Sequence, residues 1–175
     1  MGGLPSAGSA GAEGFPLERL RRYRLARRLG IVSVAIVVAM GLGGVLGVRE
    51  RTVTATAGGY ELQVTYAAVT RPGLSTVWEV IVRHEGGFDG RIGIATTAAY
   101  FDGYDFNQLY PEPGEMSERD GKILMTFEPP VGEVLRVRLD ARTTPTFHLG
   151  HRARTELVID GTPVVGVDYR TMVMP

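Results

Sequence analysis

Side chains that could bind a metal ion are concentrated in one segment, residues 101–122, with the sequence FDGYDFNQLYPEPGEMSERDGK. It supplies carboxylates at Asp102, Asp105, Glu112 and Glu115, and calcium prefers oxygen ligands of this kind. Their spacing lacks the regular ligand positions and the final bidentate glutamate of an EF-hand loop. Calcium binding by this acidic loop is therefore one alternative, and a solvated loop without a ligand is the other.

The same segment carries apolar side chains that are large for a polar loop, namely Tyr104, Phe106, Leu109 and Tyr110. Aromatic residues within a polar rim are typical anchors of protein interfaces. We therefore predict that these four residues form a partner-docking surface. The alternative is that they only fix the loop against the edge of the domain.

Histidines offer a second possible metal site. His148 and His151 lie three residues apart in FHLGH, and together with His84 they could bind zinc or copper if all three met in space. Met172 and Met174 would add sulfur ligands for a soft metal. Neighbouring proline and glycine residues predict a turn, so a shared helical face cannot be assumed, and surface histidines without a metal are the simpler interpretation.

Catalytic motifs are absent from the sequence. Ser75 and Ser117 lie outside a Gly-x-Ser-x-Gly elbow, and no glycine-rich phosphate loop or dinucleotide fingerprint is present. The chain has no cysteine, which excludes thiol nucleophiles, cysteine-ligated zinc and iron-sulfur clusters. We therefore predict that the protein is not an enzyme and uses no cofactor.

A long apolar segment precedes these residues. Residues 29–48 contain no charge, amide or proline, and Ser33 is the only polar side chain among them. A helix of this length spans about 30 Å, the thickness of a bilayer's hydrocarbon core. The segment therefore predicts one transmembrane helix. Gly43 and Gly47 form a G-x-x-x-G step that would allow close packing against a membrane-protein partner or a second copy, unless it reflects only the frequency of glycine in membrane helices.

A cleaved secretory leader is the alternative to an anchor. Residues 55–57, Ala-Thr-Ala, have the small-x-small form of a cleavage site. The apolar run is longer than the roughly 7 to 15 residues of a leader's core, and three charged residues separate it from the candidate site. Retention as an anchor is therefore favoured.

Charge predicts the orientation. Five arginines lie within positions 21–28, just before the apolar run, and basic residues beside a membrane segment favour the cytoplasmic side. Residues 49–175 hold 13 Lys and Arg against 17 Asp and Glu, a net charge of −4. We expect the chain in the cytoplasmic membrane, with the N-terminus inside and an acidic domain outside. An acidic exterior argues against nucleic acid as a partner.

The outer part of the chain shows the alternating pattern of half-buried strands. In YELQVTYAAV, for example, Tyr60, Leu62 and Val64 fall on one face and Glu61 and Gln63 on the other. Strands are predicted at 60–69, 76–84, 91–97, 98–104, 122–128, 134–141, 153–159 and 164–173. Asp160 and Gly161 predict a short hairpin turn, although Pro163 could lengthen the loop. Short strands without a long helix predict an all-β sandwich.

A lone tryptophan in an early strand, Trp78, and the turn Pro130-Val131-Gly132-Glu133 before an amphipathic strand resemble the immunoglobulin-like sandwiches of bacterial envelope proteins. The resemblance covers residues 58–173 and lacks the paired cysteines of true immunoglobulin domains. It implies an antiparallel β-sandwich that serves as a binding or assembly module.

These observations predict a domain order. Residues 1–28 form a basic cytoplasmic tail, partly disordered, 29–48 the transmembrane helix, 49–57 a linker, and 58–175 an extracytoplasmic immunoglobulin-like β-sandwich. We expect a single-pass protein of the bacterial cell envelope whose outer domain is a protein-interaction or accessory-subunit module. The alternative is a ligand- or metal-binding module.

Overall fold

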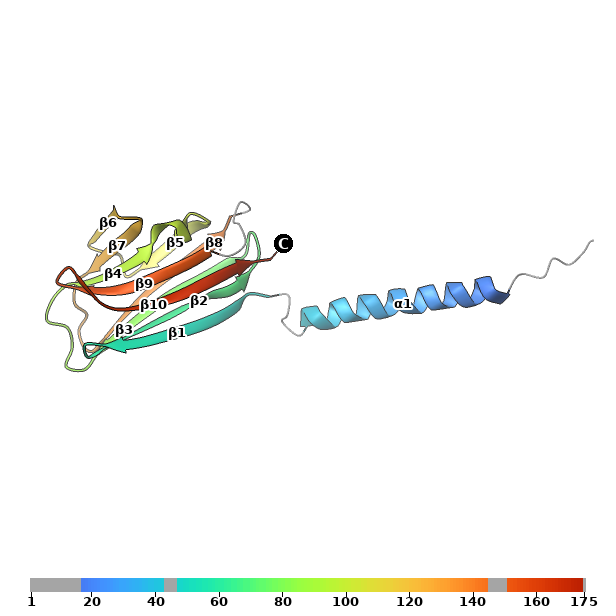
Figure 1. The fold of residues 1–175 in the computed structure, drawn as a ribbon, viewed down its shortest axis with the longest axis horizontal. Coiled ribbons are helices and arrows are strands. Elements are labelled where there is room, and N and C mark those ends of the chain that lie inside the picture. Colours follow the sequence, from blue (N-terminus) through green and yellow to red (C-terminus); the bar gives the residue numbers. More distant parts are fainter. Residues whose placement is uncertain (1–16, 43–46, 145–150, 175) are drawn as a thin grey trace, which may run out of the picture. The chain divides into compact units, whose positions relative to one another are not determined.

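The computed structural model describes residues 17–42, 47–144 and 151–174. The chain divides into two units, one within residues 1–46 and one formed by residues 47–175. The first unit contains helix α1 (Leu17–Leu42), and the second contains all of the strands (Figure 1). We call the second unit the β domain.

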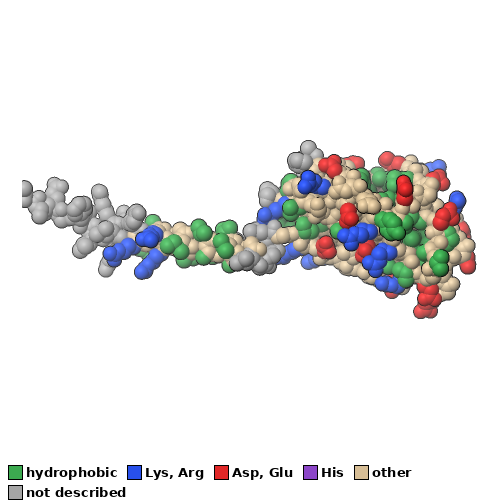
Figure 2. Space-filling view, turned by 180° about the vertical axis from the view of Figure 1, so that it is seen from behind, with side chains coloured by type: hydrophobic (Ala, Val, Ile, Leu, Met, Phe, Trp, Pro, Cys, Tyr) green, Lys and Arg blue, Asp and Glu red, His purple; other side chains and the backbone are tan. Residues whose placement is uncertain are grey.

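Helix α1 joins a basic part to an apolar part. Figure 2 shows the basic side chains grouped along one part of the helix and hydrophobic side chains along the adjoining part. The apolar side chains point in all directions and are exposed, for example Leu29 at 65% and Val34 at 63%. No helix within the described ranges combines the length and apolar character needed to cross a membrane. Residues 43–46 of the predicted span, Gly43 included, lie outside those ranges. Gly47 is described and exposed, but it lies in a bend and not in α1, so the prediction that it belongs to the helix is wrong.

The β domain consists almost entirely of strands, as the alternating pattern predicts. The strands are β1 (Arg49–Ala57), β2 (Tyr60–Thr70), β3 (Ser75–His84), β4 (Ile92–Thr97), β5 (Tyr104–Tyr110), β6 (Glu115–Arg119), β7 (Lys122–Phe127), β8 (Val134–Thr143), β9 (His151–Ile159) and β10 (Thr162–Val173). Seven of them match predicted strands to within a few residues. The prediction of an all-β fold is therefore confirmed.

The strands form two packed layers. One layer contains β1, β2, β3, β8 and β5, and the other contains β10, β9, β4, β7 and β6, with neighbours antiparallel within each layer. The last residues of β10 pair in parallel with the end of β2, at Val69 and Thr70, and join the layers along one side. The result is a curled sheet folded into a sandwich (Figure 1).

The core lies between the layers because alternate residues of each strand point inward. Val64 and Val80 come from one layer and Ile94 and Leu157 from the other, and all four are fully buried. Trp78 is buried on β3, as the resemblance to immunoglobulin-like domains implies.

Hydrogen bonds cross the core between the layers. Trp78 Nε1 donates to Tyr169 Oη over 2.8 Å, and Tyr169 Oη is 3.0 Å from Thr155 Oγ1. Burial raises the pKa of Tyr169 far above its ordinary value, so this hydroxyl stays protonated. Because buried polar groups are costly unless they are paired, this network fixes how the layers face each other.

Tyr169→Phe is expected to lower the free energy of unfolding by about 2 kcal/mol, because it leaves the buried Trp78 Nε1–H without its acceptor. Denaturant unfolding of the full chain in mild detergent, followed by the fluorescence of Trp78, the only tryptophan, measures this. Tyr110→Phe is the control, since the Tyr110 side chain is 71% exposed. Equal stability of the two variants would contradict the prediction.

The turn between β9 and β10 is a two-residue hairpin, as predicted. Asp160 and Gly161 have φ angles of 49° and 75°, and Ile159 pairs with Thr162 directly across the turn. Positive φ at both central residues is typical of a type I′ turn. Pro163 does not lengthen the loop, and the pairing is instead irregular between Pro163 and Val165.

Three predicted assignments are corrected. Residues 49–57, predicted as a linker, form β1, which pairs with β2 along its whole length. Residues 98–104 were predicted as a strand, but 98–101 form the short helix α2 (Ala98–Phe101). Tyr100 and Phe101 are both buried, and consecutive residues of a strand cannot both face one core. The acidic loop, residues 101–122, contains the strands β5 and β6.

A group of charged side chains joins β7, β9 and β10 on the second layer. Glu156 accepts from Lys122 Nζ at 2.5 Å and from Arg154 Nε at 2.7 Å, and Arg154 also contacts Asp168. The Glu156 side chain is only 11% exposed. The hydrogen bond from Lys122 lowers the pKa of Glu156 below its ordinary value of 4.5, and the one from Arg154 adds to this effect.

This pKa shift predicts acid sensitivity. Because the folded-state pKa of Glu156 is lowered, its contribution to stability is complete above about pH 4.5 and is lost as the pH falls through the folded-state value. Glu156→Gln should reduce the free energy of unfolding at pH 7 and flatten its decline below pH 4.5. Glu128→Gln, which removes an ion pair with both side chains 68% exposed, is the control. The prediction fails if both variants follow the wild-type pH profile.

Candidate functional site

The two layers are joined along one side by β10 and β2, and the opposite side is bordered by β5 and β6. Among the described strands, β5 pairs only with β8 and β6 only with β7. Each therefore has one edge whose backbone N–H and C=O groups are free to pair with another chain. All five residues of β6 are exposed. This side of the sandwich therefore offers two strand edges to which a further segment could bind.

An apolar pocket of about 250 Å³ opens between these two edges. We call it the β5–β6 pocket. Its lining includes the core residues Trp78, Phe101, Met125 and Leu139, the half-buried Ile123, and Phe106, Asn107, Gln108, Leu109 and Met116 from the two edge strands. Small-molecule sites usually occupy about 300–1,000 Å³. The β5–β6 pocket therefore suits one or two apolar side chains better than a whole ligand.

A β-bulge in β5 directs two of its side chains into the pocket. Phe106 pairs with Ala141 and Leu109 with Leu139, and the register shifts between Phe106 and Gln108. Ala141 and Leu139 both face the core, so Phe106 and Leu109 face the interior as well. In a regular strand, residues three apart point to opposite faces. The bulge therefore places both side chains in one pocket.

Phe106 forms an exposed wall of this pocket. Its ring centroid lies 5.4 Å from that of Phe101, yet its side chain is 55% exposed. Met116 on β6 is likewise 55% exposed and pairs with the buried Met125. Exposed apolar side chains around a concave apolar floor are typical of an interaction site.

The structure separates the four predicted docking residues. Phe106 and Leu109 line the β5–β6 pocket. Tyr110 is 71% exposed and borders an adjoining open groove together with Leu109 and Met116. Tyr104 is buried, and its hydroxyl donates to Tyr100 Oη over 3.3 Å. Burial raises the pKa of Tyr104, and its place in the core excludes direct contact with a partner.

Two carboxylates, Glu112 and Glu118, lie near the apolar mouth. Glu118 is exposed on the same strand face as Met116 and pairs with Ile123 of the pocket. Glu112 borders the adjoining groove. Within the described part of the chain, neither Glu112, Glu115 nor Glu118 forms an ion pair. The rim is therefore acidic and available to a cation.

The residues of the predicted metal sites are distributed over separate elements. Asp102 follows α2, Asp105 lies in β5, and Glu115 begins β6 after Glu112. The described residues contain no group of three or more His, Asp or Glu placed to hold a metal ion. The metal prediction thus has no supporting cluster in that part of the chain.

The histidines are also separated. His84 at the end of β3 stacks on Tyr60 with centroids 4.1 Å apart, and its Nδ1 lies 2.9 Å from the Gly59 carbonyl oxygen. His151 begins β9 at the other end of the sandwich, and His148 lies outside the described residues. His84 therefore has a structural role in the β1–β2 turn.

No protein-family model matches the chain, and no curated protein matches it. The solved structures that are similar to the chain include three β structures. One is the sixth cohesin of Acetivibrio cellulolyticus scaffoldin B, solved with a Cel5 dockerin, at 15% identity and a TM-score of 0.36 over 61% of this chain and 94% of that chain. Another is the chitin-binding domain of a Pyrococcus furiosus chitinase, at 14% identity and a TM-score of 0.36 over 65% of this chain and 99% of that chain. The third is the major pilin subunit of Bacillus cereus, at 6% identity and a TM-score of 0.39 over 73% of this chain and 40% of that chain. Similarity of this degree assigns neither a partner nor a ligand to the β5–β6 pocket.

Proposed function

We propose that this chain is a single-pass membrane protein of the bacterial cell envelope whose extracytoplasmic β domain is a protein-interaction or accessory-subunit module without enzymatic activity. The observation that carries the proposal is the β5–β6 pocket, which is apolar, open and bordered by two strand edges that no other described strand covers. Its small volume favours the side chains of a protein partner.

The rim specifies the chemistry of that partner. Glu112 and Glu118 are exposed carboxylates without ion pairs in the described residues, beside an apolar floor. The occupant that complements both features is an extended segment with an apolar side chain flanked by Lys or Arg. Its apolar side chain enters the pocket, its cations meet the rim, and its backbone pairs with the edge of β5 or β6.

The membrane anchor is part of the proposal. It rests on the uncharged run 29–48 and on the exposure of apolar side chains around α1, Ile36 and Val37 among them. Basic residues before the run favour an N-terminus in the cytoplasm.

β1 favours retention of the anchor over cleavage. Processing after Ala57 would remove every residue of β1, a strand paired with β2 from Arg49 to Ala57. Val53 and Ala55 of β1 also pack against the core. Cleavage of a leader at this site would thus remove one strand, β1, from the exported domain.

Extraction of membranes in mild detergent tests this function. A C-terminally tagged chain is purified from its native host, and the proteins that accompany it are identified by mass spectrometry. The proposal expects an uncut chain in the membrane fraction with a stoichiometric membrane-protein partner. Recovery of the chain from the soluble fraction, or of the membrane-bound chain alone, would contradict it.

A further inference from the structure

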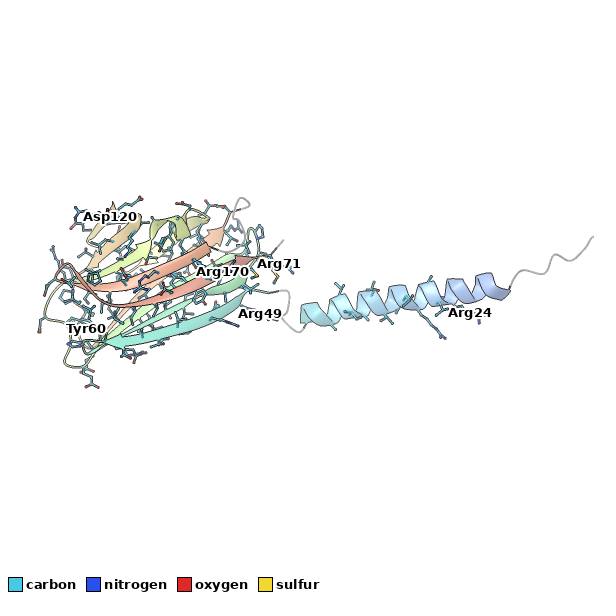
Figure 3. All side chains as sticks on the ribbon, viewed as in Figure 1. Arg24, Arg49, Tyr60, Arg71, Asp120 and Arg170 are labelled. Carbon is cyan, nitrogen blue, oxygen red and sulfur yellow. The ribbon has the colours of Figure 1, made fainter. Side chains whose placement is uncertain are left out.

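Six arginines gather at the end of the β domain where β1 begins. They lie at the start of β1, after the end of β2, near the end of β8, and where β9 begins and β10 ends: Arg49, Arg51, Arg71, Arg142, Arg152 and Arg170. We call this the basic end. In Figure 3, the labelled Arg49, Arg71 and Arg170 lie toward this end, whereas Tyr60 lies at the opposite one.

These arginines differ in their partners from most other arginines of the β domain. No ion pair among the described residues involves any of the six. At the opposite end, by contrast, Arg83 contacts Glu61 at 2.6 Å and Arg91 contacts Glu128 at 2.9 Å. The guanidinium groups of the basic end are therefore available to an external anion.

Two of the six are placed against each other. Arg152 on β9 and Arg170 on β10 are directly opposite in the antiparallel register, and both are exposed. Like charges in this position destabilise a sheet. Arg154 lies two residues after Arg152, on the same face of β9, and forms ion pairs with Glu156 and Asp168. The uncompensated pair costs stability that an anion bound between the two guanidinium groups would restore.

The charge of the β domain is divided between its ends. At the basic end, six arginines face three carboxylates, Glu50, Asp102 and Asp105, which leaves a net charge of +3. The opposite end carries two arginines, Arg83 and Arg91, against six carboxylates: Glu61, Glu85, Asp89, Glu128, Glu133 and Asp160. The net charge of the opposite end is −4. The two ends of the β domain therefore carry net charges of opposite sign.

We propose that the basic end binds the anionic phospholipid headgroups of the membrane from which the chain emerges. The inference rests on the proposed membrane anchor. Helix α1 ends at Leu42 and β1 begins at Arg49, so only the six residues 43–48 connect the helix to the end of the domain where β1 starts. Arginines near an anionic surface are attracted to it, and the acidic opposite end is repelled.

Spin labelling of the full-length chain in nanodiscs tests the inference. The chain has no cysteine, so Met172→Cys labels the basic end and Thr162→Cys the opposite end. Nickel-chelating headgroup lipids report how close each label lies to the bilayer. In discs rich in phosphatidylglycerol, the label at position 172 should relax faster than in phosphatidylcholine discs, and high salt should remove the difference. The label at position 162 should show no such dependence.

The charge variant is Arg152→Gln with Arg170→Gln, which also removes the like-charge pair and so should not unfold the domain. It should lower the ratio of lipid-bound to free domain by about fivefold for each arginine. Arg91→Gln with Arg136→Gln removes the same charge from elsewhere and should leave that ratio unchanged.

Two outcomes would overturn the inference, and they have different meanings. A chain that is embedded in the discs, with equal relaxation at position 172 in both lipids, refutes lipid binding by the basic end and leaves the anchor intact. A chain that does not enter the discs refutes the anchor and the lipid contact together.

Discussion

Phe106→Asp is expected to abolish recovery of the partner with the tagged chain. Phe106 forms the exposed wall of the β5–β6 pocket, so the substitution introduces a carboxylate into an apolar site with an acidic rim. Central anchors of interfaces contribute 2 kcal/mol or more. We therefore expect the dissociation constant to rise by at least about 30-fold. Binding of the purified partner, measured in detergent, gives this value.

Val131→Asp is the matched control. Val131 is the most exposed large apolar side chain described in the β domain, and it lies in the turn before β8, outside the pocket. Both substitutions replace an exposed apolar side chain with a carboxylate, and only Phe106→Asp should lose the partner. Melting temperatures of both variants check that the domain remains folded. Equal binding by the two variants would show that the β5–β6 pocket is not the docking site.

Removal of residues 1–57 is expected to destabilise the β domain severely, whereas removal of residues 1–46 is not. The longer truncation deletes β1, which contributes the ladder hydrogen bonds to β2 and the core contacts of Val53 and Ala55. Burial of one valine stabilises a fold by about 1.5–3 kcal/mol, and each backbone hydrogen bond adds about 1 kcal/mol net. The total is a large part of the roughly 5–15 kcal/mol that stabilises a domain.

Denaturant unfolding of the two truncated chains, followed by the fluorescence of Trp78, measures the difference. The chain that begins at Gly47 should unfold cooperatively. The chain that begins at Gly58 should be largely unfolded without denaturant or should aggregate through the exposed edge of β2. If both chains unfold at the same denaturant concentration, β1 is not an integral strand, and cleavage after Ala57 becomes compatible with a folded domain.

The sequence was sufficient to predict most strands because their alternation reflects which face is buried. Val80 and Val82 on β3, for example, are fully buried as the pattern indicates. The same signal was present in β1, where Val53 and Ala55 alternate with threonines. Gly58 and Gly59 then supply the positive φ angles of a two-residue hairpin. Residues 49–57 therefore carry a strand pattern and not that of a linker.

The pocket could be predicted only in part. The apolar character of Phe106 and Leu109 is visible in the sequence, and the docking hypothesis drew on it. Phe106 and Leu109 face the same side only because β5 contains a bulge. That bulge depends on the register of β5 against β8, which the sequence of β5 does not reveal. Met116, Ile123 and Met125 join the site through the pairing of β6 with β7, which also depends on the fold.

Tyr104 was predicted to be exposed but is buried. Its position among acidic residues suggested a surface aromatic, but the preceding helical turn α2 places it in the core beside Tyr100, with ring centroids 5.4 Å apart. The turn exists because Tyr100 and Phe101 are both buried. Tertiary packing therefore overrode the local strand pattern at residues 98–104.

Site-specific photocrosslinking in the native membrane tests the central claim most directly. A photoreactive amino acid is placed at position 106 in one chain and at position 131 in another, and the crosslinked peptides are sequenced. The proposal predicts that position 106, but not 131, crosslinks to one segment of one membrane protein, and that this segment has an apolar side chain flanked by Lys or Arg. Equal crosslinking from both positions, or a crosslinked segment without that pattern, would contradict the assignment of the β5–β6 pocket as the docking site.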